Sequence, residues 1–293
     1  MHARAVAATT TALLGSIAVL FPADGAAADG EGAAASPLVL AHRGACAHAP
    51  ENTLAAVDRA AELGVEWVEN DVQRTKDGEL VVVHDDVLRR TTDVEQVFPG
   101  RAPWRVGDFT AAEIARLDAG SWFGSDHAGA RVPTLTEFLR RLDHHGQKLL
   151  LELKRPELYP GIERETLRVL ADEGWLDEEH LADRLIVQSF DLDSLRTLHG
   201  IGPGMRTGFL GTPSLAQVRD HARFVDQVNP SHESLTADYV RAVRSITGAH
   251  GRPLEVFTWT VDDAATARKV AAYGVDGVIT DRPDVVRDAL ARQ

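Results

Sequence analysis

The sequence has little cysteine, few aromatic residues and fewer positive than negative charges. Cys46 is the one cysteine among 293 residues, so no intramolecular disulfide can form and stability must come from packing or from a bound metal. The 31 Lys and Arg residues against 44 Asp and Glu residues give a formal net charge of −13. Excess negative charge disfavours binding to nucleic acid or to anionic membranes. These absences favour an enzyme with a small-molecule substrate.

A long apolar run is absent from the N-terminal part as well. The apolar stretch 11–21 is well short of the roughly 20 residues that a membrane-spanning helix needs. It follows Arg4 and precedes three alanines at 26–28, a pattern typical of a cleaved export signal rather than a membrane anchor. We therefore expect a signal peptide over 1–28, a disordered Gly/Ala/Ser-rich lead-in over 29–36, and a secreted mature protein without stable membrane insertion. The pattern does not indicate an oligomeric state.

Residues 37–293 form one predicted domain in which apolar strand-like runs alternate with helix-period segments. Near-continuous apolar strands are typical of a parallel sheet that is covered on both faces. Eight strands in a domain of about 260 residues favour a closed (β/α)8 TIM barrel with a single core. The predicted strands are 38–42, 67–72, 148–154, 184–189, 206–210, 224–229, 255–260 and 277–280.

Helix signals support this alternation. Thr110 with Glu113, Thr134 with Glu137, and Ser214 with Gln217 each match a capping box. Gly64, Gly174 and Gly274 follow helical runs, where a left-handed residue would end the helix. The predicted helices include 54–63, 162–173, 214–221, 238–247 and 264–273.

One segment does not fit the barrel count. Residues 80–85 follow Asp77-Gly78, a dipeptide typical of a hairpin turn. We therefore expect a short antiparallel return off the second strand that brings His84 toward the end of the barrel. Residues 87–133, with one clear helix, are interpreted as a small insertion after this hairpin.

Charged residues occur where predicted strands end. Glu69 and Asp71 have the same parity and share one face of the second strand, and Glu152 and Lys154 share a face at the end of the third. Active sites of this fold lie at the carboxyl ends of the strands. An oxygen-only set favours Ca2+ or Mg2+. Structural ion pairs with Arg43, Arg74 or Lys154 are the alternative interpretation.

The ordered motifs resemble those of glycerophosphodiester phosphodiesterases over nearly the whole predicted domain. The matching segments are His42-Arg43-Gly44, Pro50-Glu51-Asn52-Thr53, Glu69-Asn70-Asp71-Val72, Thr75-Lys76-Asp77-Gly78, His84-Asp85, Arg90-Thr91-Thr92, Pro133-Thr134-Leu135, Glu152-Leu153-Lys154, Gln188-Ser189-Phe190, Trp259-Thr260-Val261 and Thr280-Asp281-Arg282-Pro283. Their order and spacing are specific, although each motif is short.

The resemblance implies a TIM-barrel hydrolase that binds one divalent cation, Ca2+ or Mg2+. It implies the following roles: acid/base catalysis by His42 and His84, metal binding by Glu69, Asp71 and Glu152, and phosphate binding by Arg43 and Lys154. We assign His42 as the base and His84 as the acid. Direct attack by water and attack by a glycerol hydroxyl, which would give a cyclic phosphate, both remain open.

Several other residues are candidates for supporting roles. Glu51 is a candidate to orient Arg43, Gln188 to approach the ligand oxygens, and Trp259 to line the alcohol pocket or to pack in the core. The remaining expectations are that Asn52 or Thr53 caps the first helix, Cys46 is a small buried or loop residue rather than a nucleophile, His48 is a solvated loop histidine, and 281–283 fix the final loop.

The predicted activity is hydrolysis of glycerophosphodiesters to sn-glycerol 3-phosphate and an alcohol. A lysophospholipase D or a glycerol-phosphate polymer hydrolase is the related alternative, for which exposed Trp104, Phe109, Trp122 and Phe123 would form an apolar surface beside the site. A non-catalytic phosphodiester-binding protein is the alternative of a different class. The complete histidine pair and acid set argue against a mere binder.

Overall fold

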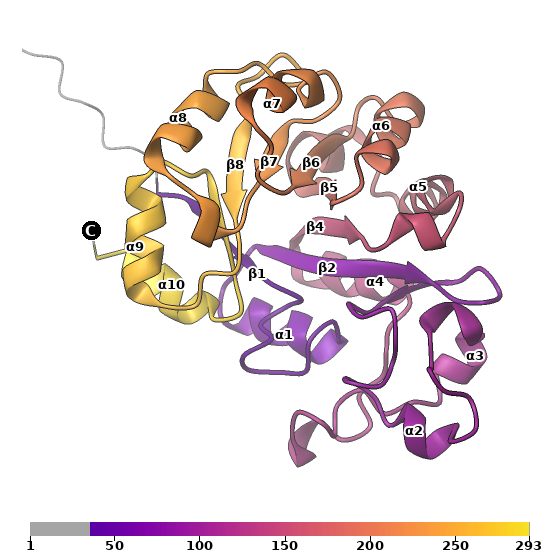
Figure 1. Cartoon of the computed structure of the whole chain (residues 1–293). Coiled ribbons are helices and arrows are strands. Elements are labelled where there is room, and N and C mark those ends of the chain that lie inside the picture. Colours follow the sequence, from indigo (N-terminus) through magenta and orange to yellow (C-terminus); the bar gives the residue numbers. More distant parts are fainter. Residues whose placement is uncertain (1–35, 293) are drawn as a thin grey trace, which may run out of the picture. The chain divides into compact units, whose positions relative to one another are not determined.

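The computed structural model describes residues 36–292. The predicted signal peptide, 1–28, and all of the lead-in except residue 36 lie outside this range. Within it, eight parallel strands form a closed barrel, because β1 pairs with both β9 and β2 (Figure 1). The prediction of a (β/α)8 TIM barrel is confirmed. The barrel strands are β1 (Leu38–Ala41), β2 (Trp67–Arg74), β4 (Lys148–Leu153), β5 (Leu185–Ser189), β6 (Arg206–Leu210), β7 (Gln227–Asn229), β8 (Glu255–Thr258) and β9 (Gly277–Thr280).

Helices cover the outside of the barrel, and most follow a strand directly in sequence (Figure 1). All three predicted capping boxes are present at Thr110, Thr134 and Ser214. The helices are α1 (Leu54–Glu62), α4 (Leu135–His145), α5 (Ile162–Asp172), α6 (Leu192–Ile201), α7 (Leu215–His221), α8 (Ala237–Arg244), α9 (Ala264–Ala272) and α10 (Pro283–Leu290). Shorter turns are η3 (Pro156–Leu158), η4 (His180–Arg184) and η5 (His232–Ser234).

The core has two layers, as expected for this fold. The larger lies between the strands and the surrounding helices. The smaller fills the barrel with inward-facing apolar residues from six strands: Leu40, Trp67, Leu150, Ile186, Phe257 and Ile279. These interior residues have the same strand parity as the polar residues that follow them, so the side chains at the carboxyl end of the barrel point inward as well.

The hairpin after the second strand is confirmed. β3 (Leu80–Val82) pairs antiparallel with β2, with Val72 opposite Val82. The expected range 80–85 is longer than this strand, because the chain leaves the ladder before His84. The backbone N–H of Val83 still donates to the carbonyl of Asp71, which holds the departing chain beside the strand end.

The insertion differs from its prediction. It contains two short α-helices, α2 (Val94–Val97) and α3 (Ala111–Ile114), together with the turns η1 (Val106–Asp108) and η2 (Ser125–His127). They lie to one side of β2 in Figure 1. The expectation of a single core is wrong, because the insertion and β3 pack around a cluster of their own. Its buried residues are Val81, Val83, Leu88, Val94, Val106, Phe109, Ile114, Leu117, Ala119 and Val132.

The sixth predicted strand is also corrected. The sequence indicated 224–229, whereas β7 begins only at Gln227. The backbone N–H groups of Phe224 and Val225 donate to the carbonyl of His221, so these apolar residues close the turn after α7 instead. An apolar run alone does not distinguish a buried turn from a buried strand.

Candidate active site

Three neighbouring strands bring the predicted polar residues together at the carboxyl end of the barrel. In the parallel register, Asp71 on β2 lies beside Glu152 on β4, and Glu152 lies beside Gln188 on β5. Glu69 shares the inward parity of Asp71. The parity of these positions in the sequence therefore predicts the correct face of each strand. Closure of the barrel then brings the side chains together.

The carboxylates of Glu69, Asp71 and Glu152 form a compact buried cluster. Each offers an oxygen atom within 4.8 Å of the others. Burial raises the pKa of Glu69 well above its ordinary value, and the charges of Asp71 and Glu152 raise it further. Burial and the charge of Asp71 likewise raise the pKa of Glu152 to about 7, against the effect of Lys154. The cluster is electrostatically unfavourable without positive charge among the carboxylates.

The cluster fits a hard divalent cation. Oδ1 of Asp71 is buried without a hydrogen-bond partner among the residues described, and Nζ of Lys154 is 3.7 Å away. Its other oxygen, Oδ2, accepts a hydrogen bond of 2.7 Å from Asn52 Nδ2. A fixed carboxylate with one free oxygen, beside two further carboxylates, is a suitable ligand set for Ca2+ or Mg2+.

Two cationic side chains border the acids. Nζ of Lys154 lies 2.8 Å from Glu152 Oε1, and Nε of Arg43 lies 3.4 Å from Asp71 Oδ2. Burial acts to lower the pKa of Lys154, but Asp71 and Glu152 outweigh it and raise the pKa. Both side chains therefore remain charged beside the cavity. The alternative interpretation, that these residues form structural ion pairs, is supported in part because these cations and acids contact one another.

The loop after β1 has a backbone conformation that aims Arg43 at the acids. Arg43 and Asn52 have positive φ angles of 53° and 57°, which cost energy for residues other than glycine. This conformation allows the backbone N–H of Arg43 to donate to Glu69 Oε2 at 2.9 Å. Thr53 rather than Asn52 caps α1, because its side chain accepts from the N–H of Ala56. Asn52 instead holds Asp71.

Each candidate histidine has an aspartate on its Nδ1 atom. Nδ1 of His42 lies 2.6 Å from Asp281 Oδ1, and Nδ1 of His84 lies 2.7 Å from Asp85 Oδ1. Because a carboxylate only accepts, each Nδ1 carries the proton and each Nε2 is left to exchange one. Burial, together with Arg43 and Lys154, lowers the pKa of His84, although Asp71 and Asp85 oppose this.

A network of charged side chains links Arg43 to His84 on one side of the site. Arg90 donates to Asp85 Oδ2 at 2.6 Å and to Glu51 Oε2 at 2.6 Å. Glu51 also accepts from Arg43 at 2.9 Å. The predicted partnership of Glu51 with Arg43 is thus present. Arg90 fixes Asp85, and through it His84, relative to Arg43.

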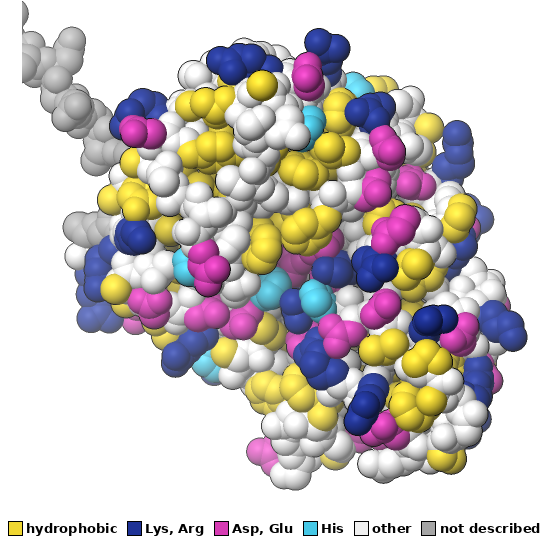
Figure 2. Space-filling model, viewed as in Figure 1, with side chains coloured by type: hydrophobic (Ala, Val, Ile, Leu, Met, Phe, Trp, Pro, Cys, Tyr) yellow, Lys and Arg dark blue, Asp and Glu magenta, His cyan; other side chains and the backbone are white. Residues whose placement is uncertain are grey.

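The predicted residues surround one cavity of about 110 Å³. All of them line it except Asp71, which lies below the surface, and Glu51, which lies behind Arg43 in the network. The lining residues are His42, Arg43, Glu69, His84, Glu152, Lys154, Gln188, Phe190, Leu210, Trp259, Thr260 and Ile279. Figure 2 shows histidine, acidic and basic side chains gathered near the middle of this face.

The two predicted supporting residues differ in position: Gln188 is buried, whereas Trp259 lies at the open side of the cavity. Gln188 is buried, and its Oε1 accepts from Asn229 at 3.0 Å. Trp259 donates through Nε1 to the carbonyl of Asn229 at 2.8 Å, and its ring meets that of Phe190 edge-on at 5.8 Å. Because Phe190 is 52% exposed, this aromatic pair borders the open side of the cavity.

Sequence reasoning missed the roles of Asp281, Asp85, Arg90 and Phe190. All four belonged to the quoted motifs, but none received a role at the site. Asp281 was assigned to the final loop, whereas it orients His42. The signal that could have found Asp85 was its position next to His84. Nothing local in the sequence indicates that Arg90, in the insertion, returns to Glu51.

Two loop residues lie at the edge of this arrangement. His48 does not line the cavity, and its Nε2 pairs with Asp284 at 3.0 Å. Cys46 is partly buried, and burial together with the nearby Asp281 raises the pKa of its thiol. A thiol with a raised pKa is a poor nucleophile, consistent with the expectation for Cys46.

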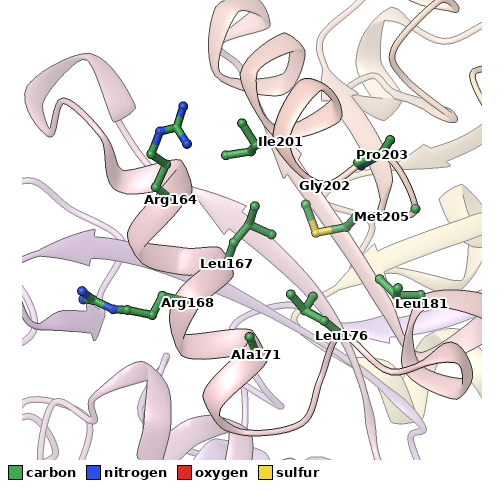
Figure 3. Close-up of a pocket in the computed structure, with 11 residues that line it drawn as sticks. Arg164, Leu167, Arg168, Ala171, Leu176, Leu181, Ile201, Gly202, Pro203 and Met205 are labelled. Carbon is green, nitrogen blue, oxygen red and sulfur yellow. The ribbon is translucent and has the colours of Figure 1, made fainter.

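Three larger cavities lie in the described part of the chain: one of about 340 Å³ adjoins the site through Glu152, Lys154 and Phe190, whereas the other two share no lining residue with it. One of about 450 Å³ is bordered by α5, the end of α6 and Met205. Figure 3 shows Leu167, Leu176 and Leu181 facing it, while the guanidinium group of Arg168 points away. Another, of about 570 Å³, includes Arg206 and Glu255, which begin β6 and β8. It therefore lies at the end of the barrel opposite the site.

The fold and site define a barrel enzyme whose cavity combines acidic, cationic and histidine side chains. Residues 42–285 match the glycerophosphoryl diester phosphodiesterase family. The chain is 36% identical to a glycerophosphodiester phosphodiesterase of Caldanaerobacter subterraneus subsp. tengcongensis over 85% of this chain and 96% of the relative. It is 34% identical to a Bacillus subtilis enzyme of the same name, over 85% and 84% of the two chains.

A solved structure agrees with these relatives. An Oleispira antarctica phosphodiesterase, solved in complex with its product sn-glycerol-3-phosphate, superimposes with a TM-score of 0.72 and 30% identity, over 87% of this chain and 97% of that one. The chain belongs to the glycerophosphoryl diester phosphodiesterase family. The predictions of the family and of an enzyme of this class are confirmed. Among residues 36–292, no helix combines the length and apolarity needed to cross a membrane.

Proposed function

We propose that the chain hydrolyses glycerophosphodiesters to sn-glycerol 3-phosphate and an alcohol, using one divalent cation, Ca2+ or Mg2+. The observation that carries the proposal is the pair of histidines, each oriented by an aspartate, on a cavity that two cations and two acids line, with the third acid, Asp71, below its surface. The product held by the Oleispira antarctica relative supports the glycerol phosphate half of the substrate.

Glu69, Asp71 and Glu152 would hold the cation, and the free Oδ1 of Asp71 supports this role. When bound, a divalent cation neutralises phosphate charge and stabilises the charge that develops as the nucleophile attacks. Arg43 and Lys154 add positive charge at the same cavity. In a water-poor site, such fixed charges contribute much of the rate enhancement.

The two histidines carry out the two proton transfers of the reaction. Nε2 of His42 accepts a proton from the attacking hydroxyl, while Asp281 holds Nδ1–H and stabilises the cationic ring. Nε2 of protonated His84 donates a proton to the departing alkoxide, and Asp85 orients its ring. Such acid/base steps each contribute roughly 10²–10⁴-fold. Both direct attack by water and attack by the glycerol 2-hydroxyl use this pair.

The open side of the cavity receives the alcohol. Phe190 and Trp259 border it with their ring edges and faces, and an aromatic face suits an alcohol that bears a quaternary ammonium group. None of the residues considered for a lipid surface lines this cavity. Phe109 is fully buried in the insertion and Trp104 is half-buried, whereas Trp122 is 42% exposed.

A substrate panel tests the proposed reaction. The purified mature chain would be assayed with glycerophosphocholine, a lysophospholipid and a glycerol-phosphate polymer, each with Ca2+ or Mg2+ and with excess chelator. Release of sn-glycerol 3-phosphate from glycerophosphocholine that stops on chelation supports the proposal. Turnover of only the lipid or the polymer would contradict the substrate assignment, and tight binding without turnover would contradict catalysis.

We also propose that residues 1–28 direct export and are removed. The support is the short apolar run followed by small residues. Fractionation of the producing cells, with N-terminal sequencing of the product, tests this. A chain that begins near residue 29 in the medium or envelope is expected, and an uncleaved chain inside the cell would contradict it.

A further inference from the structure

A second group of metal-ligating side chains lies beside the acid cluster. The imidazole of His42, the thiol of Cys46 and the carboxylate of Asp281 offer ligand atoms that all lie within 4.8 Å of one another, and all three residues are partly exposed. We infer that His42, Cys46 and Asp281 form a binding site for Zn2+, and that Zn2+ bound there inhibits the enzyme.

The donor atoms distinguish this site from the acid cluster. Glu69, Asp71 and Glu152 offer oxygen alone, which suits hard cations. The second set offers nitrogen, sulfur and oxygen, and a thiolate with an imidazole selects Zn2+ over Mg2+ or Ca2+. Three protein ligands leave a fourth tetrahedral position for water. The two sites therefore differ in the cation that each prefers.

The loop geometry holds the three ligands close together. The backbone N–H of Ala47 donates to the carbonyl of Asp281 at 3.1 Å, and that of His42 donates to the carbonyl of Thr280 at 2.9 Å. These bonds fix the Cys46 loop against the loop after β9. Ligand atoms of tetrahedral zinc lie roughly 3.5 Å apart, whereas Nδ1 of His42 and Oδ1 of Asp281 are 2.6 Å apart, so these two atoms must move apart to admit the ion. Rotation of the 37% exposed Asp281 side chain can supply this.

Zinc would act through the ring nitrogen that now faces Asp281. Nδ1 of His42 lies 2.6 Å from Asp281 Oδ1, so Nδ1 is the nitrogen directed into this site. Binding releases the Nδ1 and thiol protons to solvent. The proton that remains on a neutral metal-bound ring is on Nε2, which can then no longer accept one. This inhibition rests on the proposed role of His42, whereas the site itself does not.

Zinc inhibition in a cysteine variant tests the inference. Phosphodiesterase activity would be measured in saturating Mg2+ with increasing Zn2+, for the wild-type chain, Cys46→Ser and His48→Ala. Cys46→Ser should need at least about tenfold more Zn2+ for half-inhibition, because it loses a strong ligand. His48→Ala, which removes another imidazole of the same loop, should match wild type. Equal inhibition of Cys46→Ser and wild type would overturn the inference.

Cobalt provides a readout that does not depend on activity. Co2+ in place of Zn2+ should give a thiolate-to-cobalt charge-transfer absorption in the near ultraviolet for wild type, and this absorption should be lost in Cys46→Ser. No such absorption in wild type would overturn the site. If the proposed hydrolysis fails but the absorption is present, the metal site stands and only its inhibitory role is overturned.

Discussion

Nδ1 of His42 lies 2.6 Å from Oδ1 of Asp281, although the two residues are 239 positions apart in the chain. The contact exists because β1 and β9 are neighbours in the closed barrel, with Ala41 opposite Thr280. The residue after each strand therefore meets the other at the barrel edge. Closure of the fold thus sets the orientation of one candidate catalytic group.

Asp281→Asn should lower kcat/KM about tenfold to a thousandfold, because a neutral amide stabilises the cationic His42 ring less well than a carboxylate does. The effect should fall on kcat more than on KM. Steady-state kinetics with glycerophosphocholine measure it. Asp284→Asn makes the same charge change three residues further on, in the first turn of α10 beside His48, and should remain within about twofold of wild type. Similar losses in both variants would contradict an orienting role for Asp281.

Asp85→Asn should shift the alkaline limb of the kcat/KM profile to lower pH. Burial already lowers the pKa of His84, and Asp85 is one of the groups that raise it. Without Asp85 the pKa of His84 falls further. His84 then loses the proton that it donates at a lower pH than in wild type. Asp86→Asn, at the neighbouring exposed carboxylate, is the control. An unchanged limb, or one that moves upward, would contradict the assignment of His84 as acid.

Glu152→Gln should abolish both activity and stabilisation by the cation. Ca2+ or Mg2+ at a hundredfold excess over Kd should add about 2.7 kcal/mol to the free energy of unfolding of wild type, seen as a rise in Tm. Glu152→Gln should show little rise, since it removes one of the three carboxylates. Glu157→Gln, on the adjacent η3 turn, should behave like wild type. A full cation response in Glu152→Gln would show that the cation binds elsewhere.

Gly44→Ala should destabilise the fold more than Gly78→Ala. Both glycines have positive φ, 80° and 93°, and the left-handed conformation costs alanine about 1–2 kcal/mol. At Gly44 an added Cβ would also lie 2.5 Å from Cβ of Ala56, whereas at Gly78 nothing lies within 4 Å. Urea unfolding curves of the two variants give the comparison. Equal losses would mean that α1 can move away from the Arg43 loop freely.

Local patterns predicted the barrel well because its strands are apolar on both faces. The strands Arg206–Leu210 and Gly277–Thr280 match their predicted ranges. The pattern failed at Phe224 and Val225, which close a turn, and in the insertion, where contacts with β3 build a separate cluster. Both failures concern residues whose burial depends on tertiary contacts rather than on the period of the sequence.

The candidate site was predicted in part for the same reason. Strand parity placed Glu69 and Asp71 on one face, and the barrel register brought Glu152 beside Asp71. The partners that orient the histidines were not predicted, because Asp281 meets His42 only through barrel closure. Arg90 likewise joins Asp85 to Glu51 across 39 positions, a contact that depends on how the insertion folds.

The most direct test of the account is the rate of sn-glycerol 3-phosphate release from glycerophosphocholine by His42→Ala, His84→Ala and His48→Ala. The account predicts that each of the first two loses roughly 10²–10⁴-fold in kcat, while His48→Ala, whose imidazole pairs with Asp284 outside the cavity, stays close to wild type. Folding of all three would be checked by their Tm. Near-wild-type turnover by folded His42→Ala or His84→Ala would contradict the proposed histidine pair.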